Sequence, residues 1–281
     1  MTLYEYPSTL SSALTILSEH PDALLLGGGT MIMPKLATGE LRPEVILDVS
    51  RIPELTRVVL GAEGDWTLGA AVTYQTVLST PGLPLLLRTA ATGVTGGPQI
   101  LAQGTIGGSA SYANPASDMP SILVALNAKL IVDGVHGRQE IAAGEFFESA
   151  FVTAITQRPM MLCQIRIPAD RINLPSSYVK LKVAESSWPV VTAATTIINP
   201  AAPEWSRQCR VTVGGSSETP FSIVFSTNVN LSTLREFFEQ SALSWIDDTL
   251  ASAAYRKRVT PVVVERSIRK ALERMESVEQ I

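Results

Sequence analysis

The sequence is poor in charge and contains no cluster of basic residues. Charged residues make up 17% of its 281 residues, and the formal net charge is −4. Nucleic acids and anionic membrane surfaces are bound mainly through clustered positive charge. We therefore expect neither of them as a partner.

Cysteine and histidine occur only twice each, as Cys163, Cys209, His20 and His136. Their spacing fits neither a metal site nor a disulfide framework. Iron–sulfur clusters take four cysteine ligands, so this chain cannot hold one with its own cysteines. Both histidines fall in predicted loops and suggest no Ser–His–Asp set. We interpret the cysteines as small buried apolar residues in a reducing compartment.

No apolar run is long enough to cross a bilayer, and Met1–Pro7 lacks the basic and apolar regions of a secretory signal. We expect a cytoplasmic protein, with peripheral membrane contact left open. Hydrophobic residues make up 46% of the chain, which is typical of a well-buried globular protein. The length favours two or three lobes.

A run of glycines follows the apolar segment Ala23–Leu26 and comprises Gly27, Gly28 and Gly29, with Thr30 after them. Consecutive glycines cost backbone entropy, so they persist where φ is positive or where something approaches the backbone closely. Backbone N–H groups between a strand and a helix start can hold an anion such as phosphate. An ordinary tight turn explains the tetrapeptide equally well, because it matches no established phosphate-binding motif.

Around this turn the first 55 residues have β/α character. A helix is predicted from Leu10, capped by Ser8 or Thr9, because apolar residues recur at helical spacing. Val45–Val49 predicts a buried strand, and Arg51–Leu55 predicts a turn.

The middle of the chain predicts paired strands, helices and a second glycine-containing turn. Strands are predicted at Arg57–Leu60, Trp66–Ala70, Lys129–Val132 and Met161–Ile167, helices after Thr73 and from Pro84 to Thr92, and a loop at Gly93–Pro98. Thr105–Gly108 is a second place where backbone can approach a ligand. Asp118 can cap a helix at Pro120–Asn127, or its carboxylate can accept from sugar hydroxyls.

From about residue 174 the pattern becomes strands followed by helices. Strands are predicted at Tyr178–Val183, Val190–Ile198 and Cys209–Val213, a helix capped by Ser232, and an amphipathic helix from Val264 to Met275. If the two glycine turns face one another, a ligand with a pyrophosphate and sugar hydroxyls would satisfy both. Since no acid–base set is evident, the cofactor itself is expected to carry the chemistry.

These segments resemble the FAD-binding medium subunits of the molybdenum hydroxylase family, the carbon monoxide, xanthine and nicotine dehydrogenase type. The first FAD segment of that family is similar to Leu25–Leu36, Arg42–Val49 and Arg51–Leu55. Its second FAD segment, which reads T-I-G-G followed by P-A-x-D-x-P, is similar to Gly104–Ala128. Matching patterns also occur at Arg166–Pro168, at Gly214-Gly215 with Pro220, and at Ala254–Arg256.

The resemblance implies an α+β protein with a PCMH-type, vanillyl-alcohol-oxidase-like FAD-binding fold. Two α/β subdomains, residues 1–56 and 57–173, would clasp FAD. Residues 174–281 would form a C-terminal α+β domain of antiparallel strands and helices.

It also implies which residues bind the cofactor. The pyrophosphate would be held by Gly27, Gly28, Gly29, Thr30 and Met31. The segment that would lie along the cofactor comprises Thr105, Ile106, Gly107, Gly108 and Ser109. The polar chain of the cofactor would lie near Asn114 and Asp118, and the flavin would lie near Leu162, Lys182 and Trp188. For Leu162 and Trp188, plain core packing is an equally good reading. No catalytic residue and no metal ligand is expected on this chain.

The sequence departs from the family pattern at three places. Gln99–Gln103 lacks the Arg-Asn pair that usually precedes T-I-G-G, Met31 replaces a polar residue, and Met160 stands where an acidic residue is common. These departures concern the flavin environment and subunit contacts rather than the pyrophosphate cradle.

By resemblance, the chain is an FAD-carrying electron-transfer subunit of a heterotrimeric molybdenum hydroxylase. A small subunit would carry [2Fe-2S] clusters and a large subunit the molybdenum cofactor, in a dimer of heterotrimers that passes electrons to an external acceptor. Two alternatives remain open, a stand-alone FAD-dependent oxidase or reductase of the same fold and an FAD-free scaffold. We expect Gly28→Val to lose FAD while largely keeping the fold, because a Cβ would enter the pyrophosphate space.

Overall fold

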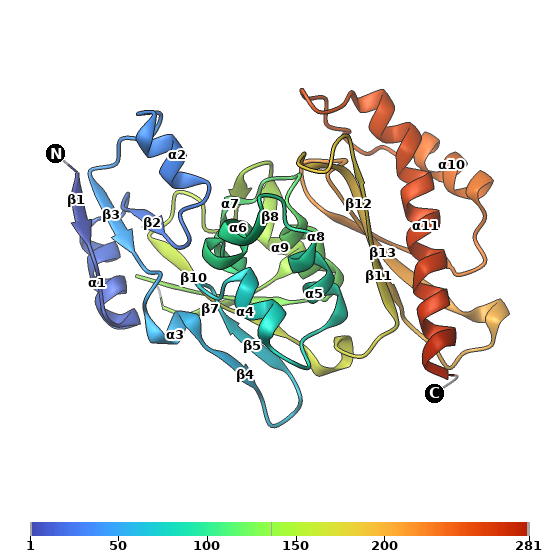
Figure 1. The fold of residues 1–281 in the computed structure, drawn as a ribbon, viewed down its shortest axis with the longest axis horizontal. Coiled ribbons are helices and arrows are strands. Elements are labelled where there is room, and N and C mark those ends of the chain that lie inside the picture. The colour runs from blue at the N-terminus through green and yellow to red at the C-terminus, as the bar shows by residue number, and fades with distance from the viewer. Residues whose placement is uncertain (1, 136, 280–281) are drawn as a thin grey trace.

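The protein is described by a computed structural model for residues 2–135 and 137–279, so His136 lies outside the described residues. Three main sheets follow one another along the long axis of the molecule, from the N-terminal sheet to the C-terminal one (Figure 1). Each sheet falls within one of the three predicted ranges, and among the described residues no strand pairs across them.

The N-terminal sheet is parallel and has three strands. Its spatial order is β1 (Leu3–Glu5), β3 (Val45–Asp48) and β2 (Leu24–Leu26), with helices α1 (Leu10–Glu19), α2 (Ile32–Ala37) and α3 (Pro53–Thr56). Thr9 caps α1, since its hydroxyl accepts a hydrogen bond from the Ser12 N–H at 3.1 Å. The α1 face formed by Ala13 and Leu17 packs with Leu47 in a small core.

The middle sheet is antiparallel and has five strands. Its order is β4 (Val58–Leu60), β5 (Trp66–Gly69), β10 (Met160–Ile167), β6 (Lys129–Gly134) and β7 (Gln139–Ala142). Its other elements are α4 (Tyr74–Ser79), α5 (Leu85–Thr92), α6 (Gly97–Gln103), α7 (Ile106–Tyr112), α8 (Asp118–Ala125), α9 (Ala143–Phe146), β8 (Phe147–Ser149) and β9 (Val152–Thr153). Helices and sheet share one large apolar core that includes Leu68, Ile106 and Leu130.

The C-terminal unit is a four-stranded antiparallel sheet covered on both faces. Its strands are β11 (Ser176–Lys182), β12 (Pro189–Ile197), β13 (Gln208–Gly214) and β14 (Phe221–Ser226), and its helices are α10 (Leu231–Gln240) and α11 (Ala253–Glu279). A short 3-10 turn at Ala169–Arg171 precedes this unit, and another lies within it at Glu204–Ser206. Helix α11 packs against β11 and β12, and α8 of the middle unit packs against β12 and β13 (Figure 1). The central strand β12 is therefore buried along its whole length.

Several sequence predictions of local structure were wrong. The predicted loop Gly93–Pro98 ends early, because Gly96 turns the chain at a φ of 110° and α6 begins at Gly97 with Pro98 in its first turn. The turn predicted at Arg51–Leu55 contains the short helix α3. Strand β14 was not predicted at all.

Two predicted helix caps were also wrong. Asp118 is the first residue of α8, and Ser117 occupies the cap position without a side-chain hydrogen bond. Asn230, rather than Ser232, caps α10, because its side-chain oxygen accepts from the Thr233 N–H at 2.9 Å. The apolar pattern located this helix correctly, but its capping oxygen comes from an amide side chain two residues before Ser232.

Candidate cofactor-binding site

The turn after β2 requires glycine for two reasons, a left-handed backbone conformation at one residue and the close approach of another chain segment at the residue before it. Gly29 has a φ of 70°, in the left-handed region that favours glycine. At Gly28 an added Cβ would lie 1.8 Å from the carbonyl oxygen of Gln103. The turn is thus pressed directly against the backbone that leads into the second glycine segment.

This turn also presents unused backbone donors. Among the described residues, the N–H groups of Gly28, Gly29 and Thr30 have no hydrogen-bond acceptor on the protein. Neighbouring backbone N–H groups that point into one concavity form an anion site. The donors belong to the loop before α2, whose first helical residue is Ile32.

The second glycine segment is built differently. Thr105 caps α7, accepting from the Gly108 N–H at 3.0 Å, and the Ile106 N–H donates to the carbonyl of Val72 at 3.0 Å. An added Cβ on Gly107 would lie 2.5 Å from the carbonyl oxygen of Ala70. Gly107 therefore serves close packing of α7, while a Cβ added to the exposed Gly108 would lie 2.6 Å from the Thr105 hydroxyl that caps the helix.

A cavity of about 460 Å³ lies between the two segments. Cofactor sites commonly have volumes of about 300–1,000 Å³. Among the residues named from the sequence, it is lined by Gly27, Gly28, Gly29, Thr30, Met31, Thr105, Gly107, Gly108, Ser109, Asn114, Leu162 and Trp188. Segments far apart in the sequence, from both α/β units and from the β11–β12 loop, thus meet around one volume.

Residues 1–170 match the family described as "FAD binding domain in molybdopterin dehydrogenase". The chain belongs to this family. FAD is accordingly the cofactor of this chain, and the cavity fits such a group, because backbone N–H donors without a protein acceptor line it at the glycine turn. The fold class and the oxidoreductase class expected from the sequence are confirmed.

Similar proteins include medium chains of several dehydrogenases. The chain is 28% identical to the nicotine 6-hydroxylase medium subunit of Paenarthrobacter nicotinovorans, over 94% of this chain and 95% of that one. It is 30% identical to the carbon monoxide dehydrogenase medium chain of Hydrogenophaga pseudoflava, over 66% of this chain and 65% of that one.

Solved structures agree in fold. A chain of carbon monoxide dehydrogenase from Hydrogenophaga pseudoflava superposes with a TM-score of 0.87 at 23% identity, covering 97% of this chain and 98% of that one. A chain of quinoline 2-oxidoreductase from Pseudomonas putida 86 gives a TM-score of 0.86 at 20% identity, covering 98% of both chains.

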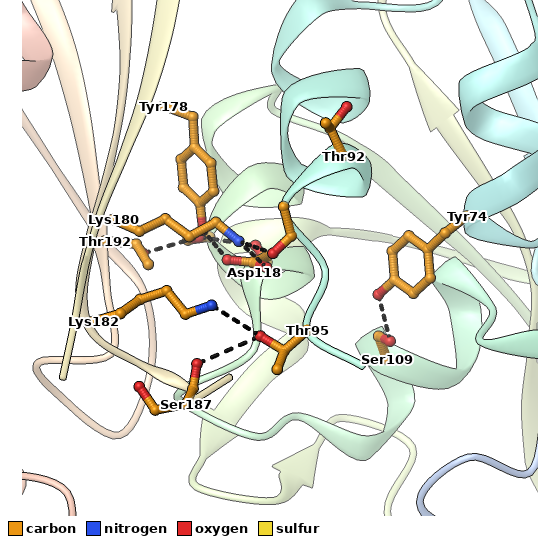
Figure 2. Close-up of polar contacts among 12 residues, drawn as sticks. Tyr74, Thr92, Thr95, Ser109, Asp118, Tyr178, Lys180, Lys182, Ser187 and Thr192 are labelled. Carbon is orange, nitrogen blue, oxygen red and sulfur yellow. Dashed lines mark hydrogen bonds and ion pairs between the residues drawn. The ribbon is translucent and has the colours of Figure 1, made fainter. Parts of the chain in front are cut away.

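Three residues named from the sequence lie elsewhere in this FAD-binding chain. Ile106 is fully buried in the core of the middle unit, and neither Asp118 nor Lys182 lines the cavity. Both oxygens of Asp118 are already bonded within the protein. Tyr178 donates to one at 2.6 Å, and Lys180 donates to the other at 2.6 Å (Figure 2).

The Asp118 cluster joins the middle unit to the C-terminal sheet. The Lys180 ammonium also donates to the Gly93 carbonyl at 2.8 Å, so it ties β11 to both α8 and the end of α5. Burial and the neighbouring Asp118 carboxylate raise the pKa of Tyr178 well above its ordinary value. Tyr178 therefore stays protonated and donates to Asp118.

Lys182 holds the loop that carries Trp188. Its ammonium donates to the Thr95 hydroxyl at 3.2 Å and to the Glu185 carbonyl, and Thr95 donates to the Ser187 carbonyl at 3.4 Å (Figure 2). These bonds fix the β11–β12 loop against the segment before α6. Trp188, which is 38% exposed, is thereby presented to the cavity.

A buried tyrosine orients one hydroxyl of the site. The Tyr74 and Ser109 hydroxyls lie 2.7 Å apart (Figure 2). Burial raises the pKa of Tyr74, so its phenol stays neutral. The pair holds Ser109 of α7 at the wall of the cavity.

The sequence did not single out several residues that line the cavity. These include Asp22, Ser111, Tyr112, Ser117 and Arg158. Ser111, Tyr112 and Ser117 fall inside the Gly104–Ala128 segment, so that segment could have suggested them. Nothing in the local pattern marks Arg158.

Two features are absent from the part of the chain that the structure describes. Within residues 2–135 and 137–279, no group of three or more His, Cys, Asp or Glu residues is placed to hold a metal ion. No helix in the same ranges is both long enough and apolar enough to span a bilayer.

Proposed function

We propose that this chain is the FAD-carrying electron-transfer subunit of a heterotrimeric molybdenum hydroxylase. The observation that carries the proposal is the cavity between two glycine segments, one of which offers unpartnered N–H donors. When bound there, FAD supplies redox chemistry, because its ring system can take up electrons singly and release them to another acceptor.

This chain's residues would bind and orient the cofactor. The N–H groups of Gly28, Gly29 and Thr30 would hold the pyrophosphate, and Ser109 and Asn114 would contact the polar chain between pyrophosphate and flavin. Trp188 and Leu162 would cover the ring system and exclude water from one side. Both line the cavity, which supports this orientation.

We infer the partner subunits from the kind of protein to which this chain is similar. Several relatives are described as the medium chain or medium subunit of a dehydrogenase or hydroxylase, which supports a multi-subunit complex. We place [2Fe-2S] clusters on a small subunit and the molybdenum cofactor on a large subunit that oxidises the substrate. The complex would be a cytoplasmic dimer of heterotrimers that delivers electrons to an external acceptor.

Purification of the tagged chain from its native host tests this proposal. We expect it to co-purify in equal amounts with two other chains, and the complex to contain iron, molybdenum and FAD. The isolated FAD-loaded chain should not oxidise a substrate that reduces the complex. Recovery of the chain alone, as a flavoprotein with its own turnover, would instead support a stand-alone flavoenzyme, and recovery without FAD would support a scaffold.

A further inference from the structure

The cavity is nearly devoid of charge. Only Asp22 and Arg158 among its lining residues carry a formal charge near neutral pH. The diphosphate of FAD is negatively charged, whereas the glycine turn offers it only neutral N–H donors. A cation that faces the cavity would compensate the remaining charge.

Lys35, a basic side chain close to the lining residue Tyr112, already has a carboxylate partner. Lys35 of α2 does not line the cavity, and its ammonium lies 2.8 Å from the Glu40 carboxylate. It also lies 5.9 Å from the ring centre of Tyr112. By contrast, Arg158 has no carboxylate within 4.0 Å among the described residues.

The loop that carries Arg158 is held in place by its own side chains. The Thr156 hydroxyl accepts from the Thr153 N–H at 2.8 Å, and Ile155 is anchored in the core with 8% exposure. Gln157 then takes a left-handed φ of 59°, which brings Arg158 to the cavity at the start of β10. This turn thus presents an exposed guanidinium, with no carboxylate partner among the described residues, to the cavity that the Gly28 to Thr30 turn also lines.

We propose that Arg158 binds the FAD diphosphate and is its counter-ion in this protein. This inference rests on the proposed function of the same cavity. The guanidinium would approach from the β9–β10 loop, while the N–H groups of Gly28 to Thr30 approach from the β2–α2 loop. Its planar fork of N–H donors suits phosphate oxygens.

Titration of the flavin-free full chain with FAD tests the assignment. Wild type is compared with Arg158→Gln, Arg158→Lys and the control Arg88→Gln, at low and at raised ionic strength. Arg88 is an exposed arginine of α5 that does not line the cavity. We expect Arg158→Gln to raise the Kd for FAD by about tenfold and to weaken its salt dependence. Arg158→Lys should restore most of the affinity, and Arg88→Gln should match wild type.

Competition by inorganic pyrophosphate provides a second readout. Pyrophosphate should displace FAD from wild type at lower concentrations than from Arg158→Gln. Equal FAD affinity and equal salt dependence in wild type and Arg158→Gln would overturn the assignment of Arg158 alone. An equal loss of FAD affinity in Arg158→Gln and Arg88→Gln would also overturn the assignment, because such a loss would reflect the overall charge of the protein. If wild type bound no FAD, the proposed function itself would fail.

Discussion

At the scale of single residues, Gly28 has the least room for change. The predicted clash with the pyrophosphate is replaced by a clash within the protein, because the Gln103 carbonyl occupies the position of a Cβ. A side chain there would separate the two glycine segments before it met a cofactor. The expectation that Gly28→Val largely keeps the fold therefore needs a direct measurement.

We expect Gly28→Ala to lower the free energy of unfolding by about 1–3 kcal/mol and to lose FAD. The cause is the forced movement of the β2–α2 turn away from Gln103. Urea denaturation and flavin content after reconstitution measure the two effects. Gly144→Ala is the control, because no atom lies within 4 Å of its added Cβ. Full FAD occupancy and wild-type stability in Gly28→Ala would contradict this packing argument.

The buried phenol of Tyr178 predicts a loss of stability in alkali. In the unfolded chain it ionises near its ordinary pKa of 10.0, whereas in the folded protein burial and Asp118 raise that pKa. Its contribution is complete below about pH 10 and falls above it by about 1.4 kcal/mol per pH unit. Urea denaturation between about pH 8 and pH 11 should show a shallower decline for Tyr178→Phe. Equal slopes for the two proteins would contradict this account.

At the scale of elements, the Asp118–Lys180 ion pair joins α8 to β11. The two side chains are only 8% and 14% exposed, so loss of one charge leaves the other buried and unpaired. We expect Asp118→Asn to lower the free energy of unfolding by about 3–5 kcal/mol. In the exposed Arg166–Glu140 pair, Glu140→Gln should cost less than about 1 kcal/mol. Similar losses for both variants, measured by urea denaturation, would contradict an interdomain role for the buried pair.

Elements that depend on local sequence were predictable. Thr9 and Thr73 cap the helices that the apolar pattern located, and α11 contains the predicted amphipathic stretch. Strand β14 also had a signal, because Phe221, Ile223 and Phe225 alternate with more exposed residues.

Elements brought together by tertiary structure were not predictable in the same way. The glycine segments were recognisable because glycine has few reasons to occur in runs. Asp118 forms its hydrogen bonds with Tyr178 and Lys180, which lie in another unit of the fold. Arg158 reaches the cavity through a loop with no motif of its own. A single sequence carries no local signal for such contacts.

At the scale of the whole molecule, all three units contribute residues to the cavity that we propose holds FAD. The N-terminal unit supplies the glycine turn with its N–H donors, and the middle unit supplies further lining residues from α7 and the loop before β10. The C-terminal unit, docked through α8 and Lys180, contributes Trp188. A change that loosens this docking should therefore affect the flavin end of the site more than the pyrophosphate end.

The central claim is that this chain by itself holds FAD in the cavity between its glycine segments. The most direct test is the visible spectrum of the purified full chain after flavin removal, reconstitution with FAD and gel filtration. We predict flavin absorbance that elutes with the protein at one FAD per chain. Protein that elutes without flavin absorbance after reconstitution would contradict the claim.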